Sequence, residues 1–221
     1  MIAEVDQARA TAAVTEAERT TAGEIVTAVA ARSDSYHDAA LHWALAAMLG
    51  VPALLAWRPM LADGVWGMIG DGWSTPPASA PYLVALIGMV LVFLLARLLL
   101  ASWPLRMALT PGATKTRRVR RQALALFRVG AERRTRRRTG VLIYLSVGER
   151  RAEIVADAAI HAKVAEDVWG AAMATLLADV RDGRPGDGLV AAVQAVGTVL
   201  TEHFPIEEDD VNELPDRLVE P

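Results

Sequence analysis

The sequence predicts an α/β fold class, interrupted by a transmembrane helical hairpin. Two apolar stretches, residues 39–57 and 81–103, are each long enough to cross a bilayer. On either side of this pair, helical patterns alternate with short runs of β-branched residues, which is typical of an α/β domain. The 221 residues are 53% hydrophobic but include 23 basic and 26 acidic residues, so the chain combines membrane and soluble parts.

The two apolar stretches are expected to be membrane spans. The first holds no Asp, Glu, Lys or Arg, and the second holds only Arg97. At a rise of about 1.5 Å per residue, each covers about 30 Å, the thickness of the hydrocarbon core. The alternative is a pair of buried helices in a soluble core. A core this small has no place for two helices that are apolar all round, so we favour the spans.

Charge predicts the orientation of the hairpin. The connection, residues 58–80, is rich in glycine and proline and is expected to be an irregular external loop. Basic residues follow the second span, beginning with Arg106 and Lys115. The positive-inside rule therefore places both termini in the cytoplasm and the loop outside. The acidic N-terminus lacks the basic and apolar regions of a secretory leader, so no cleaved signal is expected.

The flanking segments predict the elements of one soluble domain. A helical period covers residues 2–20, Gly23 fits a helix C-cap, and residues 24–30 read as a strand. A basic helix is expected over 116–130, followed by a strand at 140–147. A turn at 148–149 joins that strand to another at 151–157, forming a hairpin whose first strand is buried on both faces.

Two more helices and an acidic tail complete the chain. The first helix carries apolar residues at every fourth position from Val164 to Leu176, and the second carries them at heptad-like spacing from Leu189 to Leu200. The stretch 181–188 between them is a turn, with Asp187 placed to cap the second helix. The tail, 206–221, is predicted to be a largely extended appendage.

The N-terminal helix and strand bury too little apolar surface to fold alone, so they must dock on the later elements. A domain interrupted by spans can close on one side of the membrane only if their number is even, and two spans satisfy this. The predicted organisation is therefore residues 1–38 and 104–205 as one domain, 39–103 as the hairpin and 206–221 as the tail.

Several motifs outside the hairpin resemble the TPM-domain family, in particular its bacterial membrane-anchored members. These are Thr21-Ala22-Gly23-Glu24-Ile25-Val26, Thr139-Gly140-Val141-Leu142-Ile143-Tyr144-Leu145-Ser146, the run from Glu149 to Asp157, Gly186-Asp187-Gly188-Leu189, His203-Phe204-Pro205, and Asn212-Glu213-Leu214-Pro215-Asp216. The resemblance implies an α/β/α sandwich around a small mixed sheet. It also implies a family without one settled activity: some relatives are described as acid phosphatases, some bind calcium, and others act in photosystem repair or receptor complexes.

Four polar residues are candidates for a site. Asp157 at a strand end and His161 four residues later could form an acid–base pair or help hold a metal, together with Glu153. Asp157 and Asp187 are the candidate metal ligands. The competing interpretation, which we favour, is that Asp157 caps a turn, His161 lies on the surface and Asp187 caps a helix. No phosphate-cradling loop, nucleophile elbow or His-Glu-x-x-His spacing is present, and the absence of cysteine excludes thiolate chemistry.

A basic cluster follows the second span. Residues 112–140 contain eleven basic side chains and one acid, Glu132. Contact with anionic lipid of the inner leaflet is the favoured role, ahead of a solvated face that pairs with the acidic tail. Nucleic-acid binding is third, since no motif or interleaved aromatic residue accompanies the arginines. We therefore expect no nucleic-acid partner. The predicted lipid-facing set is Arg117, Arg118, Arg120, Arg121, Arg133, Arg134, Arg136, Arg137 and Arg138.

These observations, with the resemblance to bacterial members of the family, predict a multi-pass protein of a bacterial inner (plasma) membrane. Its cytoplasmic TPM-like domain is expected to be a non-catalytic interaction or scaffold module with an unidentified membrane or cytoplasmic protein partner. The alternative is a metal-assisted phosphatase-like hydrolase that uses Asp157 and His161. No cofactor is expected. The alternative to this is a divalent cation such as calcium, which carboxylate oxygens can bind. The four acids at 207–210 would bind it only weakly without an ordered loop.

Overall fold

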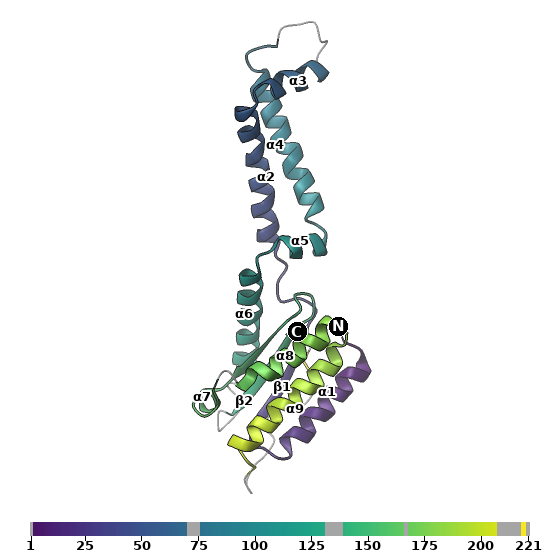
Figure 1. Ribbon diagram of the computed structural model, residues 1–221, viewed down its shortest axis with the longest axis vertical. Coiled ribbons are helices and arrows are strands. Elements are labelled where there is room, and N and C mark those ends of the chain that lie inside the picture. The colour runs from purple at the N-terminus through teal and green to yellow at the C-terminus, as the bar shows by residue number, and fades with distance from the viewer. Residues whose placement is uncertain (1, 70–75, 131–138, 166–167, 207–217, 220–221) are drawn as a thin grey trace. The chain divides into compact units, whose positions relative to one another are not determined.

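The computed structural model describes residues 2–69, 76–130, 139–165, 168–206 and 218–219 (Figure 1). The chain divides into two compact units. One unit combines Met1–Asp34 with Gly112–Pro221, and the other is Ser35–Pro111. The described residues are mostly helical, and they contain one small sheet of three strands.

The discontinuous unit contains the sheet. Its elements are α1 (Glu4–Glu18), β1 (Glu24–Ala30), α6 (Gly112–Gly130), β2 (Gly140–Ser146), β3 (Arg151–Ala156), α7 (Ala158–His161), α8 (Val168–Arg181) and α9 (Pro185–His203). The strand order is β1-β2-β3. Strand β1 runs parallel to β2, with Glu24 opposite Gly140, and β2 runs antiparallel to β3, with Val141 opposite Ala156. The predicted small mixed sheet, including its β2–β3 hairpin, is therefore confirmed.

Alternation along β2 sorts its side chains between two cores. Val141, Ile143 and Leu145 pack with residues of α1, α8 and α9. Leu142 and Tyr144 face the other way and pack against α6 through its apolar stripe of Val119, Ala123 and Phe127. All seven residues of β2 are buried, as predicted for a strand covered on both faces. Figure 1 shows α1, α9 and α8 as neighbours on their face of the sheet.

The outer edge of β1 is occupied by the end of the chain. Val219 N–H donates to the Thr27 carbonyl at 2.9 Å, and Val29 N–H donates to the Val219 carbonyl at 3.0 Å. The prediction of a tail that is only an appendage is wrong at this point, because Val219 adds to the sheet. Residues 207–217, where most of the acidic side chains lie, fall outside the described residues.

Three predicted boundaries in this unit need correction. Gly23 is not a helix C-cap: α1 ends at Glu18, and Gly23 instead packs closely against Leu200, whose side chain would lie 3.0 Å from a Cβ at this position. Val164 is buried but precedes α8. Helix α9 begins at Pro185 with Arg184 at the N-cap, so Asp187 lies inside the first turn, because proline at the first helical position starts the helix earlier than the predicted turn allowed.

A close approach of α8 and α9 depends on Gly188. A Cβ at this position would lie 2.9 Å from the Leu176 carbonyl oxygen, which is backbone and cannot rotate away. We expect Gly188→Ala to lower the free energy of unfolding by about 1–3 kcal/mol through overpacking. Gly170→Ala on α8 is the matched control: nothing lies within 4 Å of its Cβ position, so it should stabilise by about 0.5–1 kcal/mol. Urea unfolding followed by circular dichroism compares the two, and equal losses would contradict this assignment.

The second unit is helical. It contains α2 (His37–Trp57), α3 (Met60–Ile69), α4 (Ala80–Leu99) and α5 (Trp103–Leu109). Helices α2 and α4 lie side by side (Figure 1) and are long and apolar enough to cross a membrane. Most of their large side chains face outward, and on α4 these include Leu86, Leu91 and Leu98.

The sequence predicts an irregular loop between α2 and α4, and this prediction is wrong for part of the connection. Residues 60–69 form α3, which contacts α4 and buries Ala62. Gly64 and Gly67 suggested a loop, but packing of an apolar helical face against a neighbour outweighs their low helix propensity. The second apolar helix also ends at Leu99 rather than at residue 103, because Trp103 and Pro104 begin α5.

Candidate functional site

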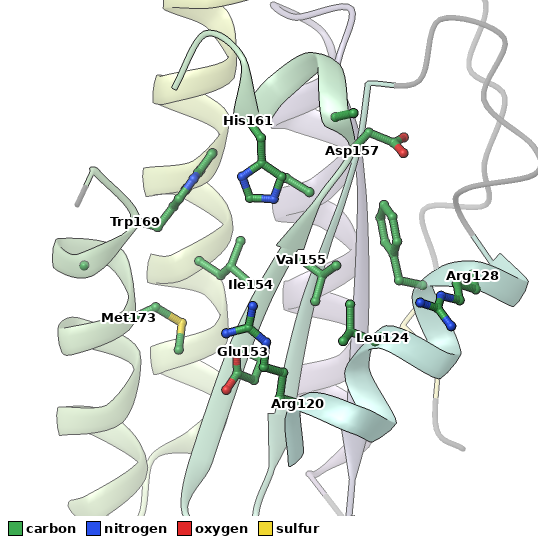
Figure 2. A pocket seen from close by; sticks show the side chains of 14 residues that line it. Arg120, Leu124, Arg128, Glu153, Ile154, Val155, Asp157, His161, Trp169 and Met173 are labelled. Atoms are coloured by element: carbon green, nitrogen blue, oxygen red, sulfur yellow. The ribbon is translucent and has the colours of Figure 1, made fainter. Parts of the chain in front are cut away.

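A groove follows the open edge of β3. Its volume is about 780 Å³, and it lies between α6 and α8 (Figure 2). The lining comes from α6 (Arg120, Leu124, Phe127, Arg128), from the strand and its end (Glu153, Ile154, Val155, Ala156, Asp157), and from α7 and α8 (Ala158, His161, Trp169, Gly170, Met173). We call this feature the β3 groove.

The backbone of β3 presents hydrogen-bonding groups to this groove. Asp157 N–H donates to the Gly140 carbonyl at 3.0 Å, which makes these two residues a hydrogen-bonded pair of the antiparallel ladder. Because such pairs alternate, Glu153 and Val155 also bond toward β2. The N–H and C=O groups of Ala152, Ile154 and Ala156 therefore point away from β2, toward the edge where no other described strand lies.

The α6 side of the groove is charged. Arg120 and Arg128 are exposed on this wall, and Glu153 on β3 lies beside Arg120 (Figure 2). Partial burial raises the pKa of Glu153, and the positive charges of Arg120 and Arg151 oppose that rise. The second carboxylate of the groove, Asp157, is buried and accepts the Gly140 N–H. Among the exposed charges of this wall, the two arginines therefore outweigh Glu153.

The α8 side of the groove is apolar. Trp169 and Met173 line it together with Ile154 of β3 (Figure 2). Gly170 leaves a gap in this wall, since a Cβ there would meet nothing within 4 Å. The Trp169 indole N–H is buried without a hydrogen-bond partner among the described residues. A buried donor of this kind is costly to leave unsatisfied.

The predicted pair of Asp157 and His161 lies at one end of the β3 groove. Asp157 is 5% exposed, and its Oδ2 accepts the buried Gly140 N–H at 3.0 Å, which ties the start of β2 to the end of β3. His161 is exposed. Figure 2 shows the carboxylate of Asp157 pointing away from the imidazole of His161. The two residues line one groove, but in this arrangement they do not form an acid–base pair.

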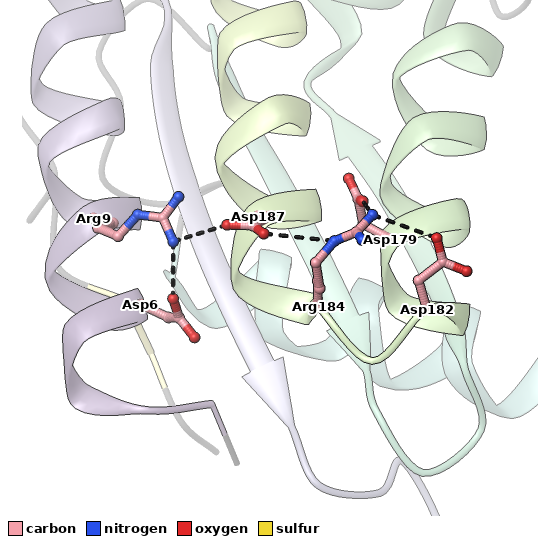
Figure 3. A network of polar contacts seen from close by, with 6 residues as sticks. All are labelled: Asp6, Arg9, Asp179, Asp182, Arg184 and Asp187. Carbon is pink, nitrogen blue, oxygen red and sulfur yellow. Dashed lines mark hydrogen bonds and ion pairs between the residues drawn. The ribbon is translucent and has the colours of Figure 1, made fainter.

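Asp187 lies outside the β3 groove. It belongs to an ion-pair network that joins the N-terminal part of α1, the end of α8 and the start of α9 (Figure 3). One carboxylate oxygen lies 2.8 Å from Arg9, and the other lies 3.6 Å from Arg184, which also pairs with Asp179 and Asp182. Asp187 therefore shares no site with Asp157. Across the part of the chain that the structure describes, no group of three His, Asp or Glu side chains is placed to hold a metal ion.

The basic cluster of α6 divides into residues with different surroundings. Arg118 is mostly covered and lies 2.9 Å from Asp34, and Arg121 lies 3.2 Å from the same carboxylate but remains exposed. Arg117 is exposed, and Arg120 belongs to the β3 groove. The remaining members, Arg133, Arg134, Arg136, Arg137 and Arg138, lie outside the described residues.

The sequence did not single out a buried polar cluster at the far end of β2. Glu149 is 8% exposed and accepts the Ser33 N–H at 2.9 Å and the Ser146 hydroxyl. The Tyr144 hydroxyl lies 2.9 Å from the Ser33 hydroxyl, and burial raises the pKa of Tyr144. Because Glu149 follows a glycine, the sequence predicts only a turn there. Its partner Ser33 is 116 residues away in the sequence, so no local pattern indicates the cluster.

Two comparisons place this geometry among known proteins. Residues 104–199 match the family model for the TPM domain. The chain carries a TPM domain. The solved structure of the BA42 protein from the psychrophilic bacterium Bizionia argentinensis is similar in fold, with a TM-score of 0.56; the match covers 100% of this chain and 96% of that one. The two sequences are 16% identical, so this likeness concerns the fold alone. No curated protein matches the chain.

Proposed function

We propose that the chain is an integral membrane protein with two spans, anchored in a bacterial inner membrane with both termini in the cytoplasm, whose TPM domain is a binding module for another protein. The observation that carries the proposal is the outward-facing apolar surface of α2 and α4, which water would solvate poorly and lipid would cover. The α/β/α sandwich implied by the family resemblance then serves as the scaffold of the binding surface.

The surroundings of Asp157 support a binding role over hydrolysis. A carboxylate that acts on a phosphate ester must reach the ester, its water or a metal ion. Oδ2 of Asp157 is instead engaged by the Gly140 N–H in a buried position. Arg117 and Arg121, which are exposed on α6 outside the β3 groove, support a further contact with anionic lipid at the inner leaflet.

Single cysteines test the topology, because the chain has none of its own. Met68 on α3 is 87% exposed and Val129 on α6 is 76% exposed, so a thiol at either position is reactive when a reagent reaches it. We expect a membrane-impermeant maleimide to label Met68→Cys in intact spheroplasts and Val129→Cys only after detergent is added. Labelling of Val129→Cys in intact spheroplasts would reverse the orientation, and recovery of the protein without detergent would exclude the anchor.

A further inference from the structure

We propose that the β3 groove binds a partner protein through an extended segment in which acidic and apolar residues alternate, and that this segment adds to β3 as a fourth strand. The proposal rests on the binding-module function above and names the site and the chemistry of its partner.

The first argument is the open sheet edge. A strand edge with unpaired N–H and C=O groups is a template for another strand. The opposite edge of this sheet is already paired through Val219 on β1. Ala152, Ile154 and Ala156 present the corresponding groups on β3, and the groove leaves room beside them. Among the described residues, the β3 edge is therefore the one edge of the sheet that can still accept a strand.

The second argument is the difference between the two walls. Successive side chains of a strand point to opposite faces of the sheet. A segment paired with β3 would direct one set of side chains toward Arg120 and Arg128 on α6, and the other set toward Trp169 and Met173 on α8. Acidic residues complement the first wall, and valine or isoleucine complements the second. Alternation of the two types thus follows from the groove itself.

The third argument concerns the length of the occupant. Consecutive residues from Glu153 to Asp157 line the groove, and a strand advances about 3.3 Å per residue, so a segment of about five to seven residues fills it. An isolated extended segment brings no flanking helices of its own to the groove. The β3 edge of a second copy carries the same two walls with it, which makes a peptide segment the better occupant.

The direct test is the binding of a defined probe to the full chain in detergent micelles. The probe is a fluorescein-labelled eight-residue peptide in which glutamate and valine alternate, and binding is followed by fluorescence anisotropy. We expect saturable binding with a Kd of about 10–100 μM, typical of a short unoptimised segment. A peptide with lysine in place of glutamate, and one with the same composition in two blocks, should each bind at least about tenfold more weakly. Equal binding of all three peptides, or none at 1 mM, would overturn the proposal.

Groove variants locate the binding. Arg120→Glu should weaken binding of the glutamate–valine peptide about tenfold, whereas Arg117→Glu, on the same helix but outside the groove, should leave it within about twofold. Gly170→Leu should fill the gap in the α8 wall and weaken binding, while Glu153→Gln should strengthen it by removing a like charge. Circular dichroism confirms that each variant is folded. Binding that is insensitive to Arg120→Glu and Gly170→Leu would place the peptide elsewhere and overturn the site.

Backbone pairing has its own readout. A strand uses the N–H groups of alternate residues toward one neighbour, so N-methylation of the peptide at one set of alternate positions should abolish binding and methylation of the other set should not. Equal effects of the two patterns would overturn strand addition.

Two further outcomes separate this proposal from the function on which it rests. A concentration-dependent dimer in light scattering that is lost on Gly170→Leu would identify a second copy as the occupant and overturn the partner segment. If the peptide does not bind but the cysteine labelling is as expected, the groove proposal is wrong and the proposed membrane-anchored binding module is unaffected. If the peptide binds to a protein that is soluble without detergent, the groove proposal holds and the membrane anchor is wrong.

Discussion

Replacement of Asp157 by alanine should lower the free energy of unfolding of the sheet-containing unit by about 2–4 kcal/mol. The carboxylate is 5% exposed and accepts the buried Gly140 N–H. Alanine would leave that donor without its partner inside the protein, and the lost bond is one to a charged acceptor, which is stronger than a neutral one.

Asp157→Asn separates this structural role from catalysis. The asparagine oxygen can still accept the Gly140 N–H, so this variant should retain stability to within about 1 kcal/mol of the parent protein. Urea unfolding measures both variants. In parallel, the full chain is assayed on p-nitrophenyl phosphate with calcium or magnesium, where we expect no turnover above that of a no-enzyme control. Turnover that disappears in a stably folded Asp157→Asn protein would establish the hydrolase and contradict the binding-module function.

The sequence predicted those features that depend on local pattern. The apolar run of β2, the apolar stretches of α2 and α4, and the hairpin of β2 with β3 are each encoded within one or two short segments. The close approach of Leu176 to Gly188 and of Leu200 to Gly23 could not be predicted from the sequence. Both are tertiary contacts, the first between two helices and the second between α9 and the residue before β1.

The candidate site depended on contacts that sequence patterns do not report. Asp157 was identified as notable, but its partner Gly140 lies 17 residues away on the neighbouring strand. Asp187 was assigned to a helix cap, whereas its partner Arg9 belongs to the other end of the chain. The β3 groove could not be predicted, since it exists only because β3 is an edge strand and because α6 and α8 cover opposite faces of the sheet.

Arg106 is expected to carry the largest single contribution in the helical unit. In the sequence it was one of several basic residues after the second span, yet the structure buries it to 8% exposure. Its guanidinium donates to the Leu100 carbonyl at 2.9 Å, the Ala101 carbonyl at 3.1 Å and the Ser35 carbonyl at 2.7 Å. Two of these carbonyls follow α4, where helix geometry leaves acceptors unsatisfied, and a cation there also meets the negative end of the helix dipole.

The bond to Ser35 extends this role to the start of α2. Ser35 precedes Tyr36, which has a left-handed backbone with φ of 53° and packs edge-on against Trp103 at 6.0 Å between ring centroids. A non-glycine residue in this region is strained and persists only when its surroundings hold it. Arg106 therefore joins the end of α4 to the entry of α2, and it does so through the fork of its guanidinium.

Arg106→Ala should destabilise the helical unit by about 3–5 kcal/mol, because it removes three hydrogen bonds from a charged donor. Arg106→Lys should recover less than half of that loss, since an ammonium keeps the charge but cannot span the three carbonyls. Arg58→Ala, at an exposed arginine that stacks on Trp57 in the same unit, is the matched control and should cost about 1 kcal/mol or less. Thermal unfolding in detergent gives the order of the three variants. Hydrogen exchange should show a loss of protection at residues 36–40 and 100–103 in Arg106→Ala, a smaller loss in Arg106→Lys, and none in Arg58→Ala. If Arg106→Lys were as stable as the parent protein, the positive charge rather than the forked guanidinium would hold the two helices together. The positive-inside rule by itself requires only that charge, because it treats lysine and arginine alike.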